Sequence, residues 1–90
     1  MDQTVPKNIL NVHVVTPRRF LYQGFALSVS SRNSEGKFDI LPEHANFITL
    51  VENQDITIKK PDNTSLVVKV HQAIIFNTEN EVEIYAEPTS

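Results

Sequence analysis

The 90-residue sequence contains no cysteine, and this absence excludes several classes of function. Without cysteine there is no disulfide framework, no thiol nucleophile and no thiolate ligand for a metal. The fold must therefore depend on packing alone. A chain of this length buries about 60–65% of the surface that its unfolded state exposes, which is enough for a modest core. We therefore expect one small domain over residues 1–90, with flexible ends at residues 1–8 and 87–90.

Basic residues are scarce as well. Eight Lys and Arg against 11 Asp and Glu give a formal net charge of −3. Nucleic acid and anionic lipid both select basic patches, so neither is an expected partner. No apolar run approaches the ~20 residues of a membrane-spanning helix, and the N-terminus lacks the basic start and apolar core of a signal peptide. These properties predict a cytoplasmic protein that does not insert into a membrane.

What the sequence does contain is apolar and polar residues in alternation, the pattern of strands with one buried face. The alternation is clearest over residues 10–14, 55–59 and 82–87. It predicts an all-β fold, a flattened β-sandwich or barrel of eight to ten short antiparallel strands without helix. The residues expected to be buried are Leu10, Val12, Val14, Ile56, Ile58, Leu66, Val68, Val82 and Ile84.

Turn-forming residues interrupt the alternation at short intervals. Thr16-Pro17 is expected to end the first strand, and Gln23-Gly24 to separate two strands. Further turns are predicted within residues 33–36, 61–63 and 78–81.

Asp39, Glu43 and His44 are the best candidates for catalysis, since a carboxylate beside a histidine can perform general acid–base chemistry. No nucleophile, oxyanion donor or phosphate-binding loop accompanies them in the sequence. The favoured interpretation is that His44 braces a turn and that the carboxylates are solvated. The alternative is a stand-alone β-sandwich hydrolase or ligand-binding module that uses these three residues.

The remaining side chains suggest no cofactor. His13, His44 and His71 lack the spacing of metal ligands. The aromatic residues alternate with aliphatic ones rather than with Lys and Arg, so an oligonucleotide-binding barrel is a weaker alternative. We expect no metal, no cofactor and no catalytic residue.

One central stretch has a distinctive order of residues. Residues 35–46 read E-G-K-F-D-I-L-P-E-H-A-N. This order resembles E-G-x-F-G-I-L-P-G-H-A-P in the N-terminal domains of F-type ATP synthase epsilon subunits, with Asp39, Glu43 and Asn46 at the three departures. The family's Pro-Gly suits a turn with positive φ at its second central residue, which is costly for glutamate. We therefore expect a type I-like turn or a helical corner at Pro42-Glu43, and ordinary β angles at Asp39.

The resemblance extends over most of the chain, through residues 10–17, 21–24 and 81–87, with departures at 52–54 and 71–73. It implies a flattened β-sandwich that is part of the rotor, or central stalk. In that family the domain docks on the gamma subunit and on the membrane ring of c subunits, and it helps to couple ion flow to ATP synthesis. The resemblance further implies a non-catalytic protein, peripheral to the inner (cell) membrane through other subunits.

The resemblance also implies an interface. In the family the Glu-Gly loop and the Pro-x-His corner lie together, facing the polar loops of the c ring. The matching residues are Glu35, Gly36, Pro42 and His44, with Ser34, Lys37 and Glu43 as neighbours outside the motif. Family members continue into a C-terminal helical hairpin that can restrain ATP hydrolysis or bind ATP. We expect neither activity from a sequence that stops at Ser90.

Overall fold

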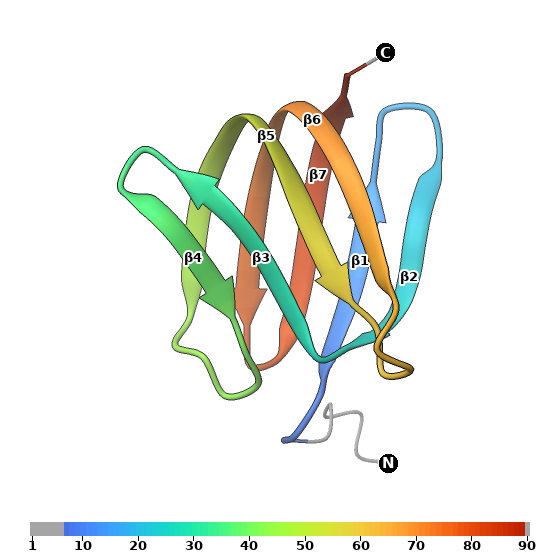
Figure 1. Ribbon diagram of the computed structural model, residues 1–90, viewed down its shortest axis with the longest axis vertical. Coiled ribbons are helices and arrows are strands. Elements are labelled where there is room, and N and C mark those ends of the chain that lie inside the picture. The colour runs from blue at the N-terminus through green and yellow to red at the C-terminus, as the bar shows by residue number, and fades with distance from the viewer. Residues whose placement is uncertain (1–6, 90) are drawn as a thin grey trace.

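The computed structural model describes residues 7–89, whose strands form one sheet in the order β2-β1-β7-β6-β5-β3-β4 (Figure 1). The strands are β1 (Leu10–Val15), β2 (Phe20–Ala26), β3 (Ser28–Asn33), β4 (Gly36–Ile40), β5 (Phe47–Lys59), β6 (Ser65–Thr78) and β7 (Glu81–Pro88). Helix is absent from these described residues. The all-β prediction is thus confirmed. One pair departs from the expected antiparallel order, because β1 and β7 run parallel.

Two strands are much longer than expected, and each bends in its middle. In β5, the buried side chain of Val51 is followed by buried Ile56 and Ile58, so the inward-facing positions change parity between them. Asn53 lies in this interval with φ of 55°, and its Oδ1 is 3.1 Å from Nδ1 of His71 in β6. The parity changes near His71 as well. Since each long strand replaces two short ones, the sheet has seven strands rather than eight to ten.

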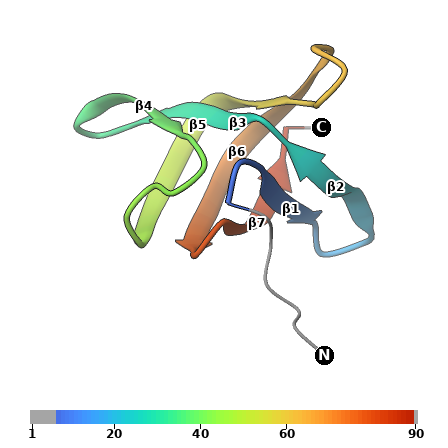
Figure 2. The same cartoon turned by 90° about the horizontal axis from the view of Figure 1, so that it is seen from below.

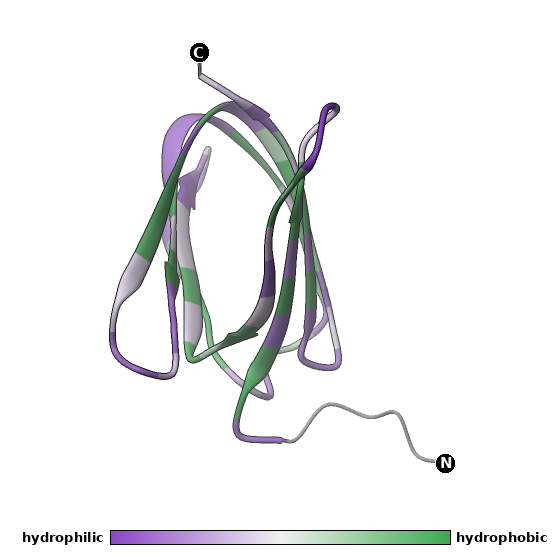
Figure 3. Cartoon of the chain, turned by 90° about the vertical axis from the view of Figure 1, so that its right-hand side faces the viewer, coloured by the Kyte–Doolittle hydropathy of each residue, from purple (hydrophilic) through white to green (hydrophobic). Residues whose placement is uncertain are grey.

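These bends fold the sheet into two layers. The first layer contains β2, β1 and β7 with residues 72–78 of β6 and 47–52 of β5, and the second contains β4, β3 and the other halves of β5 and β6. Figure 3 shows the layers facing each other and joined by the arching strands. The edge strands β2 and β4 lie far apart in Figure 2, so the sandwich is not closed into a barrel.

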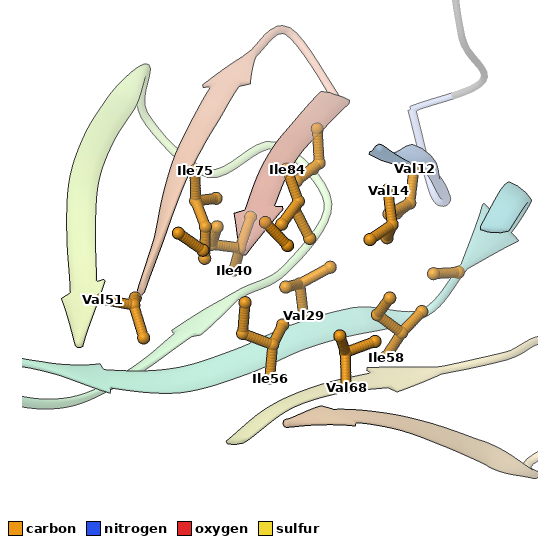
Figure 4. Packing of buried hydrophobic residues seen from close by; sticks show 14 of the residues in the cluster. Val12, Val14, Val29, Ile40, Val51, Ile56, Ile58, Val68, Ile75 and Ile84 are labelled. Atoms are coloured by element: carbon orange, nitrogen blue, oxygen red, sulfur yellow. The ribbon is translucent and has the colours of Figure 1, made fainter. Parts of the chain in front are cut away.

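The core lies between the layers and is mainly aliphatic. Figure 4 shows Val12 and Ile84 of the first layer converging with Val29 and Ile56 of the second. Valine and isoleucine suit this position because their branched side chains pack well on a pleated surface. All nine residues expected to be buried are buried except Leu66, which is partly buried and packs against the core.

The turn predicted at Gln23-Gly24 is wrong, because β2 runs through both residues and Gly24 pairs with Val12. The glycine has a different role. A Cβ atom at Gly24 would lie 3.0 Å from the Tyr22 hydroxyl oxygen, which donates a hydrogen bond to the Phe25 carbonyl at 2.8 Å. Gly24 therefore makes room for the tyrosine ring along the strand.

The other predicted turns are confirmed. β1 ends before Thr16, whose hydroxyl oxygen accepts from the Arg19 N–H at 3.2 Å. Residues 60–64 connect β5 to β6. Glu79 and Asn80 form the two-residue β6–β7 turn, with φ of 49° and 67°. Positive φ at both central residues is typical of the type I′ turn that favours tight hairpins.

Candidate protein-interaction site

The predicted interface residues lie in two loops, of which the first is the tip of the β3–β4 hairpin. Asn33 pairs with Gly36, so Ser34 and Glu35 form a two-residue loop. Gly36 has φ of 121°, a conformation that side-chain-bearing residues rarely adopt. The Asn33 side chain accepts from the Glu35 N–H at 2.9 Å and donates to the Thr49 hydroxyl at 3.0 Å. The tip, with exposed Ser34, Glu35 and Lys37, is thereby fixed to β5.

The second loop is the corner between β4 and β5, residues 41–46. The His44 N–H donates to the Leu41 carbonyl at 3.0 Å, with Pro42 and Glu43 between them. Glu43 has φ of 65°, so the expected type I-like turn or helical corner is wrong. Proline followed by a residue with positive φ is instead the pattern of a type II turn. The other half of the prediction is confirmed, since Asp39 lies in β4 opposite Ser30 and is absent from the residues with positive φ.

Two buried asparagines explain why glutamate is tolerated at this φ. The Glu43 N–H donates to Oδ1 of Asn80 at 2.7 Å. Nδ2 of Asn77 donates to the carbonyls of Ala45 at 3.1 Å and His44 at 3.4 Å. Left-handed backbone costs an ordinary residue about 1–2 kcal/mol, which several hydrogen bonds of about 1 kcal/mol each can offset. The tertiary contacts therefore overrule the local preference of Glu43.

These contacts join the corner to the β6–β7 turn as one unit, defined here as the corner unit: residues 41–46 with residues 77–80. Asn46 contributes its Oδ1, which accepts from the Glu79 N–H at 3.3 Å. The His44 ring lies edge-on to Phe47, with centroids 5.5 Å apart, and Phe47 packs in turn on Phe38. The corner is thus rigidly placed, although it is a loop.

The hairpin tip and the corner do not lie together, contrary to expectation. They occupy opposite ends of β4 (Figure 1). The strand rise of ~3.3 Å per residue puts Gly36 and Ile40 about 13 Å apart. Because β4 is an edge strand, the two loops and the strand form one margin of the sandwich, residues 34–46, which we call the β4 margin.

The hydrolase alternative finds no support, because its three residues do not converge. The Asp39 carboxylate accepts from the Ser30 hydroxyl at 2.5 Å on the outer side of the second layer. His44 faces Phe47, and its Nδ1 contacts the Ala45 carbonyl oxygen at 2.8 Å. The Glu43 side chain is exposed on the corner. No nucleophile, base and orienting group are thus held in one geometry.

The other histidines are dispersed too. His71 contacts Asn53 at the strand bend, and His13 lies on the outer side of the first layer. Over residues 7–89, no three His, Cys, Asp or Glu side chains are grouped as a metal site would require. The same residues include no helix long and apolar enough to span a membrane.

Comparison with known proteins settles the family. The model of the ATP synthase delta/epsilon chain β-sandwich domain matches residues 9–89. The chain belongs to this family. The epsilon chain of Sulfurimonas denitrificans is 35% identical over 78 residues, covering 87% of this chain and 60% of that one. The epsilon chain of Campylobacter lari is 30% identical over 81 residues, covering 90% and 62%. The chain thus spans about three fifths of the length of these relatives.

Solved structures share the fold of this family domain. A chain from the mitochondrial ATP synthase OSCP/F1/c-ring of Euglena gracilis aligns with a TM-score of 0.82 and 14% identity, over 96% of this chain and 54% of that one. A chain from the central stalk/c-ring of the Tetrahymena thermophila enzyme aligns with a TM-score of 0.74 and 14% identity, over 94% and 66%. At such low identity the likeness concerns the fold.

Sequence reasoning missed the residues that hold the family's corner in place. Asn77 and Asn80 are almost fully buried, yet each is some 30 positions or more from the corner that it binds. A signal did exist, since asparagine at an inward-facing strand position is unusual. Asn77 interrupts the inward series Ala73, Ile75 in this way. Its partner, however, could not be read from the sequence.

Proposed function

We propose that this single β-sandwich domain is the rotor domain of an epsilon-type ATP synthase subunit. It docks on the gamma subunit and on the ring of c subunits, and it transmits rotation between them. The observation that carries the proposal is the family match over residues 9–89. The domain is non-catalytic, in keeping with the dispersed positions of Asp39, Glu43 and His44, and it is peripheral to the membrane through its partner subunits.

The β4 margin forms the contact with the c ring in this proposal. Its exposed charges are Glu35 at the hairpin tip, Lys37 and Asp39 on the strand, and Glu43 at the corner. An exposed ion pair with a ring arginine contributes about 0.2–1 kcal/mol, so such charges set orientation more than affinity. Ser34, Gly36, Pro42 and His44 supply shape, because glycine and the corner unit fix the two loops.

Cysteine cross-linking tests the contact directly. The native sequence has no cysteine, so Ser34→Cys or Ala45→Cys introduces the only thiol in this chain. Each variant is assembled into the complete complex together with a cysteine in the polar loop of subunit c. We expect disulfides to the c subunit from both ends of the β4 margin. Disulfides from neither end would overturn the ring contact.

Charge reversal tests the function. Glu35→Lys should weaken the coupling of ATP hydrolysis to ion pumping while the isolated chain keeps its circular dichroism spectrum. Ser65→Lys is the control, since Ser65 is exposed at the start of β6, away from the β4 margin. Normal incorporation with unchanged coupling in the Glu35 variant would mean that this residue plays no part in the contact.

A further inference from the structure

The β3–β4 hairpin places two cations directly opposite each other. Arg32 of β3 pairs with Lys37 of β4, and both side chains are exposed on the outer side of the second layer. We call these two residues the cation pair. Directly opposite residues of antiparallel strands have Cβ atoms about 4.5–5.5 Å apart, and like charges at this distance destabilise the sheet. Neither cation belongs to an ion pair, since the one ion pair among residues 7–89 joins Lys69 to Asp55.

The carboxylates on the same face are bound to other groups. The Asp39 carboxylate accepts from the Ser30 hydroxyl at 2.5 Å, and Oδ2 of Asp55 lies 3.5 Å from Nζ of Lys69. Neither acid therefore neutralises the cation pair by direct contact. The pair remains available to a carboxylate from outside the chain.

A hollow of about 540 Å³ lies beside the cation pair. It forms where β3 and β5 diverge, because their pairing ends at Ser30 opposite Thr57 and β5 bends at Asn53. The cation pair lines the hollow together with polar residues of β5, among them Asn53. Pockets for small ligands have about 300–1,000 Å³, so a hollow of this size admits a side chain that projects from a partner.

Lysine and arginine are sorted between the two layers. The strands of the first layer contain neither, and the acids on its outer side are Glu52, Glu81, Glu83 and Glu87. The strands of the second layer contain half of the eight basic residues of the chain, namely Arg32, Lys37, Lys59 and Lys69, against two acids, Asp39 and Asp55. An acidic partner is therefore attracted to the second layer and repelled by the first.

The cation pair departs from a local rule of sheet stability, and natural proteins make such departures mainly at functional sites. A carboxylate between the two side chains would remove the repulsion. Arginine binds a carboxylate through two parallel N–H···O bonds, and lysine adds a flexible point charge. Lys37 is in the β4 margin and Arg32 is beside it on β3, so this carboxylate would come from the partner that covers the margin.

We propose that Arg32 and Lys37 bind a carboxylate side chain in the c-subunit loop that meets the β4 margin. The inference rests on the proposed function, because it names the chemistry of the ring loop. Glu35 requires a base in that loop, whereas the cation pair requires an acid. The cation pair therefore selects rings whose loop presents an acid at this position, and the two opposite charges fix the orientation of the domain on the ring.

Lys37→Glu separates the stability of the chain from its assembly. The substitution places opposite charges across the hairpin, so the melting temperature of the isolated chain should rise by about 1–8 °C. The same change should weaken the affinity of the chain for the rest of the complex at least about tenfold, because two carboxylates then meet. A residue with only a structural role would move both quantities in the same direction.

Lys59→Glu is the matched control. Lys59 is exposed on the outer side of the same layer, but it pairs with Ser28 and Ser65, away from the hollow. This variant should assemble like the wild-type chain. Equal losses of affinity in the Lys37 and Lys59 variants would overturn the proposal. An unchanged affinity or a lower melting temperature in the Lys37 variant would overturn it too.

Charge exchange identifies the partner residue. In a complex that contains Arg32→Glu/Lys37→Glu, each Asp and Glu of the c-subunit loop is replaced in turn by lysine. We expect one such ring variant to restore affinity at least about tenfold, since the exchanged charges attract each other again. Restoration by none of them, or a native ring loop without Asp or Glu, would overturn the carboxylate contact.

The outcomes distinguish this inference from the proposed function. If the wild-type chain does not assemble with the ring, or if the β4 margin forms no disulfide with subunit c, both fail. If the wild-type chain assembles and cross-links while charge exchange has no effect, only the carboxylate contact fails.

Discussion

The hairpin tip and the corner solve the same backbone problem in different ways. Each needs a residue with positive φ, and the tip uses Gly36 while the corner uses Glu43. Glycine adopts this conformation at no steric cost, so the tip needs few supporting contacts. The corner instead requires Asn77 and Asn80 to hold it. A loop can therefore be placed by its own sequence or by distant side chains, and the second method couples it to the rest of the fold.

Removing the distant support should produce the largest effect. We expect Asn80→Ala to lower the free energy of unfolding by about 3 kcal/mol, because the Glu43 N–H loses its acceptor and because alanine resists the positive φ at position 80. Urea denaturation followed by circular dichroism measures this loss. Asn80→Gly separates the two causes, since glycine accepts the positive φ but has no side chain to bind the Glu43 N–H. The glycine variant should therefore be about 1 kcal/mol more stable than the alanine variant. Equal losses in both variants would contradict a backbone contribution.

At the tip, the same comparison predicts a smaller loss. Gly36→Ala should destabilise the domain by about 1–2 kcal/mol because of its φ of 121°, although an added Cβ would meet no atom within 4 Å. The strain is therefore in the backbone alone. Ser34→Ala, in the neighbouring exposed position, is the control and should change the denaturation midpoint little. A neutral Gly36→Ala would mean that the tip relaxes to another turn.

Placing glycine at the corner position with positive φ, as at the tip, should stabilise the protein. Glu43→Gly relieves the left-handed strain, and we expect a gain of about 0.5–1 kcal/mol after the greater freedom of glycine in the unfolded chain is subtracted. For a domain of this size that gain corresponds to a rise of about 2–8 °C in melting temperature. Ala45→Gly, at a position without positive φ, should lower the melting temperature instead. A fall in both variants would show that Glu43 is not strained.

The β5–β6 turn is a reference loop that is held by neighbouring residues, and its substitution should have the smallest effect on stability. The Asp62 carboxylate accepts from the Thr64 hydroxyl at 2.6 Å and the Thr64 N–H at 3.0 Å, and these bonds lower its pKa. The carboxylate therefore stabilises the fold above its unfolded pKa, and this contribution is lost as the pH falls through the lower folded value. Asp62→Ala should lower the melting temperature slightly at pH 7, and the difference from wild type should shrink as acid protonates the carboxylate. A difference that persists in acid would point to a cause other than charge.

The strands were predictable because alternation is a local property of the sequence. Residues 10–14 and 82–87 share a buried face in both the pattern and the structure. The bends at Asn53 and His71 were not predictable, since they appear only as a change in the parity of the buried positions. Gly24 gave a misleading signal, because its role depends on where the Tyr22 side chain lies.

The candidate site was predicted in part. The motif residues Glu35, Pro42 and His44 lie in loops and Gly36 begins β4, and all four are exposed or half-buried. The cost of positive φ for glutamate predicted the wrong conformation at Glu43. The residue that compensates for this cost, Asn80, is 37 positions away in the sequence. The motif did not predict the relative position of the two loops, because the length of β4 sets the distance between them.

The parallel pairing of β1 with β7 has a consequence for how the chain folds. Val12 lies opposite Val82, so β1 cannot complete its pairing until the chain has been made as far as β7. Contacts that join such distant positions are slow to form, since the entropy of closing a long loop is lost before the pairing compensates for it. The long β5–β6 hairpin, a local contact spanning both layers, is then the natural nucleus on which the outer strands assemble. We therefore expect folding within milliseconds to seconds, as is characteristic of topologies rich in long-range β pairing.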